Sequence, residues 1–225
     1  MKPYLNTFLM KIKLLHPLNI QILSLFMMSA GWVYIFIILW NTWKGGDLKA
    51  EISAGIAPHT ALEIILELAD ALYLVHSKGI IHGDIKPANI VFRSDDCPVL
   101  IDFGISKKIE ISASQSRKAE KILASPGYAS PEIMQGKKFN QKVDIYSLGV
   151  VLYEMLVGEK PYKGATPAEI VANSMRQPIP LLPDSLKALQ PLINHMLTKD
   201  QKKRVGNARM ISRFINTFEK SFKHK

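Results

Sequence analysis

The feature that most constrains how this chain can fold is an uncharged segment near its N-terminus, Ile20 to Trp43. It reads IQILSLFMMSAGWVYIFIILWNTW and contains no Asp, Glu, Lys or Arg. A membrane-spanning helix needs about 20 mostly apolar residues, so this segment is long enough to cross a bilayer. The small residues SAG at 29–31 also divide it into two runs of strand length, which are rich in β-branched and aromatic side chains. The segment therefore predicts either a transmembrane helix at 20–43 or a buried hairpin.

The composition of the chain is that of a globular protein. It has 225 residues, of which 48% are hydrophobic and 21% charged, enough for one or two domains with a core. The net charge of +10 would suit phosphate, nucleic acid or an anionic membrane. Because the basic residues are scattered, we interpret them as a solvated surface and expect no nucleic-acid partner. The single cysteine, Cys97, excludes an intrachain disulfide and is compatible with a reducing cytosol.

Helical patterns dominate the chain after residue 50. Thr60 and Glu63 have the spacing of a capping box and predict a helix from there to Gly79. Further helices are expected over 144–158, 166–175, 185–197 and 207–221. The sequence KGGDL at 44–48 predicts a turn, VLIDFG a short strand, and 105–130 a long loop.

One cluster of polar residues has the composition of a phosphate-transfer site. HGDIKPAN (82–89) is followed by IDFG (101–104). Transfer of a phosphoryl group needs a base for the acceptor hydroxyl, a cation beside the phosphate, and oxygen ligands for Mg²⁺. Asp84 and Lys86 are candidates for the first two roles. Asn89 and Asp102 are candidates for the last.

These motifs resemble those of the protein kinase family. HGDIKPAN resembles the catalytic loop H-R-D-x-K-x-x-N, and DFG matches the family's metal-binding motif. SPE (130–132) resembles its A-P-E motif, DIYSLG its buried central helix, and SPGYASPE and EKPYKGATPAEIV those of bacterial eukaryotic-like Ser/Thr kinases. The order and spacing match over roughly residues 14–215. The resemblance implies an α+β fold with a mostly helical, complete C-lobe and an N-lobe reduced to a partial β remnant.

The resemblance also implies roles for the motif residues. Asp84 would accept or orient the hydroxyl proton, and Lys86 would stabilise the transferring phosphate. Asn89 and Asp102 would hold Mg²⁺ beside ATP. The lysine after the base points to Ser/Thr specificity and hence to a protein substrate with a Ser or Thr hydroxyl.

Four further residues match structural positions of the family. Ser125 stands where the family has a Ser or Thr of the substrate loop. Glu132 and Arg204 match a structural ion pair, and Asp144 matches the residue that braces the catalytic loop. His82 is expected to pack, and the other histidines, which are scattered, to be structural or on the surface.

The chain departs from the family pattern in two places. Gly83 replaces the motif's arginine, which in the family meets phosphate on the activation loop, so loop phosphorylation is not expected to act through that contact. No glycine-rich G-x-G-x-x-G loop and no V-A-I-K-type lysine precede residue 82, and LNTF (5–8) carries no acid where the family has its αC glutamate. We therefore expect an N-terminally truncated kinase with impaired activity.

The sequences on both sides of the uncharged segment also resemble the kinase family. LLHPLNIQIL and KGGDL resemble the residues before and after the family's β4–β5 hairpin, which favours the hairpin over a transmembrane segment. The predicted domains are an N-lobe remnant at 1–44, with the end of αC and this hairpin, and a C-lobe at 45–221. The expected location is cytoplasmic. A non-catalytic (pseudokinase) binding module and a single-pass membrane-anchored kinase fragment remain the alternatives, and the sequence specifies no substrate or oligomeric state.

Overall fold

The structure is a computed structural model that describes residues 43–102, 107–108 and 125–223. Four helices form the centre of this part of the chain. They are α5 (Pro58–Ser77), α7 (Lys142–Val157), α9 (Gln190–Leu197) and α10 (Ala208–Lys223). α5 packs against both α7 and α10, and α7 packs against α9. A continuous hydrophobic core runs through all four helices, so they hold the loops between them in fixed positions.

Helix α7 is buried on nearly every side, as its uniformly apolar sequence predicts. At its middle, Gly149 allows a close approach of α9. A Cβ atom at this position would lie 2.7 Å from the Cβ of Met196, which is too close for two carbon atoms. The helix ends at Gly158, whose left-handed conformation (φ 81°) confirms the expected glycine stop.

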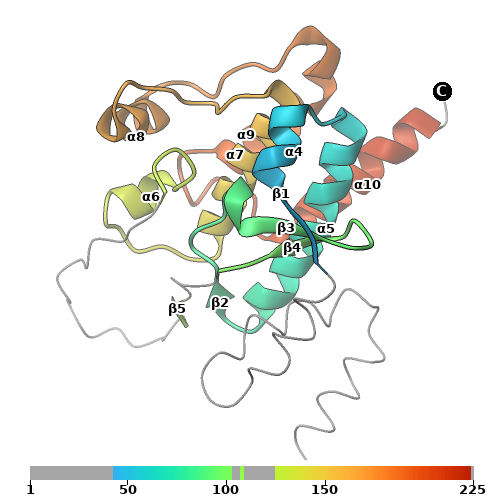
Figure 1. The fold of residues 1–225 in the computed structure, drawn as a ribbon. Coiled ribbons are helices and arrows are strands. Elements are labelled where there is room, and N and C mark those ends of the chain that lie inside the picture. The colour runs from blue at the N-terminus through green and yellow to red at the C-terminus, as the bar shows by residue number, and fades with distance from the viewer. Residues whose placement is uncertain (1–42, 103–106, 109–124, 224–225) are drawn as a thin grey trace, which may run out of the picture.

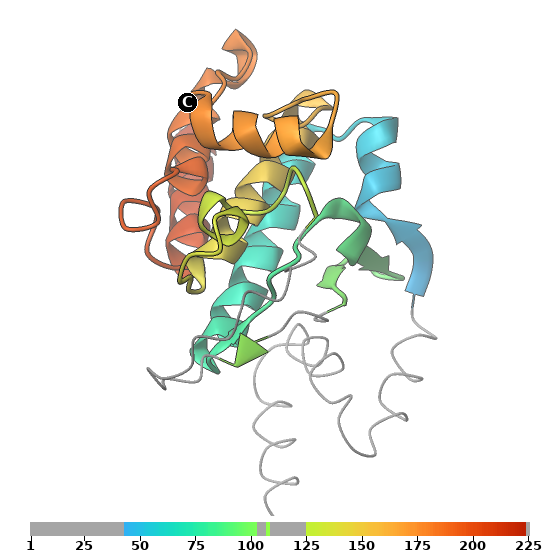
Figure 2. The same cartoon turned by 90° about the vertical axis from the view of Figure 1, so that its left-hand side faces the viewer.

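A small antiparallel sheet lies beside α5. Its strands are β1 (Trp43–Asp47), β3 (Ile90–Arg93) and β4 (Pro98–Leu100), in the order β1-β3-β4. In Figure 2, α10, α5 and this sheet follow one another from left to right. A second pair joins β2 (Ile80–Ile81) to β5 (Lys107–Lys108). The turn predicted at 44–48 is wrong, because the backbone of β1 pairs with β3 through an irregular register and this long-range pairing overrides the local glycine signal.

Shorter elements complete the described fold. Helix α4 (Leu48–Ala54) leads into α5, while α6 (Pro131–Met134) and α8 (Pro167–Arg176) contact each other at the left of Figure 1. Two 3₁₀ helices, η1 (Pro87–Asn89) and η2 (Asp184–Leu189), follow β2 and precede α9. The predicted cap of α8 is confirmed, since the Thr166 hydroxyl accepts from the Glu169 amide at 3.2 Å.

The capping box predicted at Thr60 is wrong. Helix α5 begins at Pro58, with Ala57 as its N-cap and no side-chain capping bond. Proline is favoured in the first turn, where its missing N–H costs nothing, and it starts the helix before Thr60. Glu63 instead lies 3.2 Å from the His59 imidazole, one turn earlier on the helix surface.

Only the last residue of the uncharged segment, Trp43, belongs to the described residues. Trp43 begins β1, and residues 20–42 lie outside the described residues. Within the described ranges, none of the helices combines the length and the apolar character needed to cross a bilayer. The hairpin at 20–43 and the domain boundary at 44 stay predictions.

Candidate active site

The loop HGDIKPAN connects β2 to β3, and a buried carboxylate from α7 holds its start. Asp144 accepts hydrogen bonds from the backbone amides of His82, at 2.9 Å, and Gly83, at 2.8 Å. Gly83 has a left-handed backbone (φ 81°), which glycine adopts without steric cost. Both amides thereby converge on one carboxylate, and the loop is fixed to the most buried helix of the protein. This is the bracing position expected for Asp144.

The polar side chains of the loop converge on Asp84. The Lys86 ammonium donates to the Asp84 carboxylate at 2.6 Å and to the Ser125 hydroxyl at 3.0 Å. Asn89 Nδ2 donates to the Asp84 carbonyl oxygen at 2.9 Å and to its carboxylate at 3.3 Å. Asp84 and Lys86 are both only partly exposed. A carboxylate, an ammonium and an amide from one loop therefore meet a hydroxyl that lies 39 residues away along the chain.

His82 connects this loop to the strand that precedes Asp102. Its Nε2 donates to the Ile101 carbonyl at 3.1 Å, and its Nδ1 accepts from the Asp84 amide at 3.3 Å. Burial lowers the pKa of His82, against the opposing effects of Asp144 and the Ile101 carbonyl. The neutral ring with its proton on Nε2 satisfies both contacts. His82 thus aligns the two motifs with each other as well as packing.

Asp102 lies two residues after Leu100, the last residue of that strand. It is exposed, and its backbone φ of 62° is uncommon for a residue other than glycine. Unusual backbone angles of this kind concentrate at functional sites. The Nδ2 group of Asn89 donates its hydrogen bonds to Asp84. The Oδ1 atom is therefore the part of this amide that can bind a cation. One carboxylate and one amide oxygen fit Mg²⁺, which usually takes one or two protein ligands together with substrate phosphates and water.

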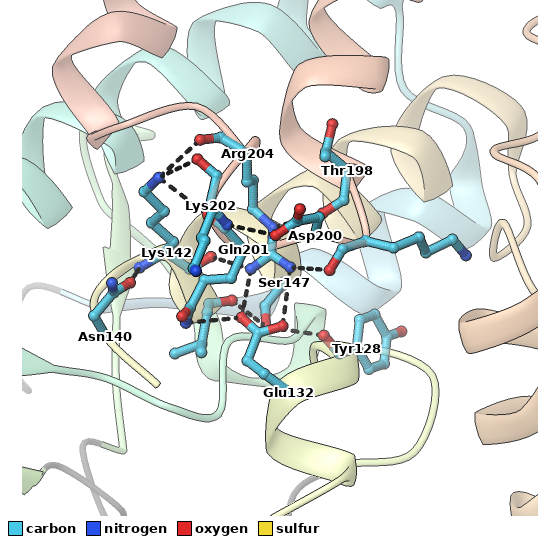
Figure 3. Close-up of polar contacts among 12 residues, drawn as sticks. Tyr128, Glu132, Asn140, Lys142, Ser147, Thr198, Asp200, Gln201, Lys202 and Arg204 are labelled. Atoms are coloured by element: carbon cyan, nitrogen blue, oxygen red, sulfur yellow. Dashed lines mark hydrogen bonds and ion pairs between the residues drawn. The ribbon is translucent and has the colours of Figure 1, made fainter. Parts of the chain in front are cut away.

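The structure also brings together Glu132, from α6, and Arg204, from the turn before α10. Arg204 Nη1 and Nη2 donate to the two carboxylate oxygens of Glu132 at 2.6 and 3.0 Å (Figure 3). Its remaining N–H groups bond to the carbonyl oxygens of Lys142, Thr198 and Lys199. Arg204 is only 2% exposed, so this pair connects the expected substrate loop to the helical core without reaching solvent.

Three contacts were not predicted from the sequence. His76 Nε2 donates to Asp144 at 2.8 Å, and both side chains are buried. Tyr128, which precedes α6, donates its hydroxyl to Glu154 at 2.7 Å, and the Lys160 ammonium lies 4.5 Å from its ring centre. The spacing of His76, four residues after the core residue Leu72, is the signal that could have placed it on the buried face of α5.

The described residues also bear on metal binding elsewhere in the protein. Among the residues that the structure describes, no group of three or more His, Cys, Asp and Glu side chains could hold a metal ion. The Asn89–Asp102 pair contains only one residue of these four types, so the two side chains alone do not make a complete metal site. A cation there would take its remaining oxygen ligands from phosphate or water.

Comparison with known proteins agrees with this geometry. The family model described as "Protein kinase domain" matches residues 6–215. The chain belongs to the protein kinase domain family. This membership confirms the family resemblance and the α+β kinase-like fold. Protein kinases generally use ATP and Mg²⁺ and act on protein substrates.

Several curated proteins are similar to the chain. The Ser/Thr protein kinase PknB of Mycolicibacterium smegmatis is 37% identical over 126 residues, which cover 56% of this chain and 20% of PknB. PkaB of Streptomyces coelicolor is 32% identical over 64% of this chain and 37% of PkaB. Sgk1-A of Xenopus laevis is 36% identical over 62% of this chain and 32% of that protein. The matched region is therefore a fifth to about two fifths of the relatives' own lengths.

Proposed function

We propose that this kinase domain transfers the γ-phosphate of ATP to a Ser or Thr hydroxyl of a protein. The observation that carries the proposal is the contact of Lys86 with both Asp84 and Ser125, at 2.6 and 3.0 Å. It joins a base, a cation and the expected substrate loop in one arrangement, as phosphoryl transfer requires. The similarity to PknB and PkaB, both named Ser/Thr protein kinases, supports the same substrate class.

The proposed step follows from these positions. The Asp84 carboxylate accepts the proton of the attacking hydroxyl, whose oxygen forms a bond to the γ-phosphorus as the bond to the β-phosphate oxygen breaks. Lys86 offsets the negative charge on the transferring group and holds the Asp84 carboxylate in orientation. Asn89 and Asp102 would hold Mg²⁺, which supplies charge neutralisation on the phosphates when bound. Asn89 also fixes Asp84 through its two Nδ2 hydrogen bonds.

We further propose that residues 1–225 by themselves have low activity, because this stretch contains no glycine-rich loop and no strand lysine. Positioning and electrostatics supply most of this catalysis, so loss of part of the nucleotide clamp costs orders of magnitude in rate. The same absence favours the second candidate, a non-catalytic kinase-like module that binds proteins through its C-lobe. The two candidates differ in whether the chain binds ATP and transfers its phosphate.

The test uses the purified full chain with radiolabelled ATP, Mg²⁺ and a generic Ser/Thr protein substrate. We expect weak phosphate transfer to Ser and Thr that disappears in Asp84→Asn, while Asp184→Asn, an exposed acid on η2, retains it. Binding of ATP would be measured in parallel by the Mg²⁺-dependent shift in melting temperature, with Asp102→Asn as the control. No transfer and no shift would support the binding module. Robust transfer that depends on Asp84 would overturn the proposed impairment.

The domain layout and location are part of this proposal. An N-lobe remnant over 1–44 would precede a C-lobe over 45–221, and the chain would reside in the cytoplasm, where ATP is available. The similarity of the segment before β1 to a kinase hairpin supports this arrangement. Extraction of cell membranes with alkaline carbonate tests it, since a chain that stays in the membrane pellet would favour the membrane-anchored alternative at 20–43.

A further inference from the structure

The segment 177–183, with the sequence QPIPLLP, connects α8 to η2 and belongs to no helix or strand. Six of its seven residues are either a proline or the residue directly before one. Proline fixes φ at about −65°, and a residue before proline is pushed toward the extended and polyproline II regions. The sequence therefore favours a polyproline II helix, in which side chains on one edge recur every three residues.

The backbone at both ends of this segment has the favoured conformation. Gln177 has φ −70° and ψ 147°, and Pro183 has φ −52° and ψ 151°, against about −75° and 145° for polyproline II. Figure 1 shows the orange chain beyond α8 as an extended stretch along the edge of the fold. The Gln190 side chain of α9 holds it, because Oε1 accepts from the Leu182 amide at 2.7 Å and Nε2 donates to the Pro180 carbonyl at 3.4 Å. The extended shape is thus fixed before any partner binds.

The three-residue repeat separates buried from exposed side chains in this segment. Ile179 and Leu182 share the inner edge, where Leu182 is buried and Ile179 packs partly buried against the core. Pro178 and Leu181 share another edge and are exposed. Leu181 is 80% exposed, the highest value among the large apolar side chains that the structure describes. The seven residues carry no charge, so a partner would recognise their shape and apolar character.

We propose that residues 177–183 dock into a groove lined by aromatic side chains on a partner protein, of the kind that binds polyproline II segments. Pro178 and Leu181 would enter this groove along one edge, and Pro180 and Pro183, which have the spacing P-x-x-P, along the other. Because the segment is already extended and anchored, docking loses little conformational entropy. A second copy of this chain fits less well, because two proteins with a charge of +10 each repel one another. The inference requires no phosphate transfer and is independent of the proposed activity.

The experiment titrates the full chain, without ATP, into two isotope-labelled probes, an isolated SH3 domain and an isolated WW domain. Both domain types bind proline-rich segments in aromatic-lined grooves. Changes in the NMR chemical shifts of each probe identify the surface that binds the chain. We expect binding to at least one probe, with shifts at the aromatic residues of its groove. Leu181→Ala should weaken this binding about tenfold, because it removes apolar surface that the groove would bury.

The matched control is Met210→Ala, which shortens another exposed apolar side chain, on α10 and outside the segment. This change should leave the affinity for the probe as it was. Thermal unfolding of both variants checks that they fold. Absence of binding to both probes would overturn the proposal, as would equal weakening by the two changes or shifts confined to residues outside the groove. Sedimentation that shows a dimer dispersed by Leu181→Ala would also overturn it, in favour of a second copy as occupant.

Discussion

Arg204 binds both carboxylate oxygens of Glu132, and neither side chain is exposed to solvent by more than a few per cent. All five guanidinium N–H groups have acceptors, since three backbone carbonyls complete the set. The ring of Tyr146 lies 5.0 Å from the guanidinium carbon. A planar fork with this many acceptors cannot be replaced by a lysine, which carries a single point charge and three donors. The pair therefore acts as a structural connection between α6 and the turn before α10.

Replacing this arginine should cost stability. In Arg204→Lys the bidentate contact and several carbonyl bonds are lost, while the Glu132 carboxylate stays buried. We expect the free energy of unfolding to fall by about 3 kcal/mol, a typical cost of breaking a buried ion pair. Urea denaturation followed by circular dichroism measures this change. The exposed Lys203→Ala, from the same turn, is the control and should change it by less than about 0.5 kcal/mol. A similar, small effect of both changes would contradict the structural role of the pair.

Gly83 offers a test of the backbone at the catalytic loop. Its φ of 81° places an L-residue with a Cβ in an unfavourable region, so Gly83→Ala should reduce the free energy of unfolding by about 1 kcal/mol. Asparagine tolerates the left-handed region better than alanine, and Gly83→Asn should therefore cost less. Thermal unfolding of the two variants measures how much stability each loses relative to the unchanged chain. Equal losses, or a larger loss for asparagine, would show that backbone strain is not the cause.

Much of this site could be predicted because its residues are close in sequence. Asp84, Lys86 and Asn89 occupy one short loop, and their polar character in an apolar chain marks them without any structure. The helices α7 and α8 were predictable for a similar reason, since Gly158 and Thr166 are local stop and start signals. Such signals depend on a few neighbouring residues and are complete in the sequence.

Contacts between distant segments were harder to predict. The pairing of β1 with β3 joins residues 44 to 50 positions apart, and nothing in KGGDL indicates a strand. His76 belongs to a helix face that was predicted, but its partner Asp144 is 68 residues away. These features arise from packing, which a single sequence does not display.

Asp144 should be essential to the shape of the catalytic loop. In Asp144→Asn one oxygen becomes an NH₂ donor, which faces the amides of His82 and Gly83 or the imidazole of His76 without an acceptor. An unsatisfied buried group of this kind costs about 1–3 kcal/mol. Hydrogen exchange measures the effect locally. We expect the amide protons of His82 and Gly83 to lose protection while those of α10 keep theirs, and uniform protection in the variant would refute this role.

The buried histidine of the loop predicts a dependence of stability on pH. Burial lowers the pKa of His82 below its usual value near 6.5, so the unfolded chain binds this proton at a higher pH than the folded chain. Because the unfolded state then binds more protons, the free energy of unfolding falls as the pH drops below about 6.5. In His82→Gln this part of the loss disappears, and the difference in unfolding free energy between about pH 7.5 and 5.5 should shrink by up to about 1 kcal/mol. Urea titrations of both proteins at the two pH values measure it. The other histidines are common to both proteins and cancel in the comparison, so equal pH dependence would show that His82 binds its proton in the folded state as readily as in the unfolded chain.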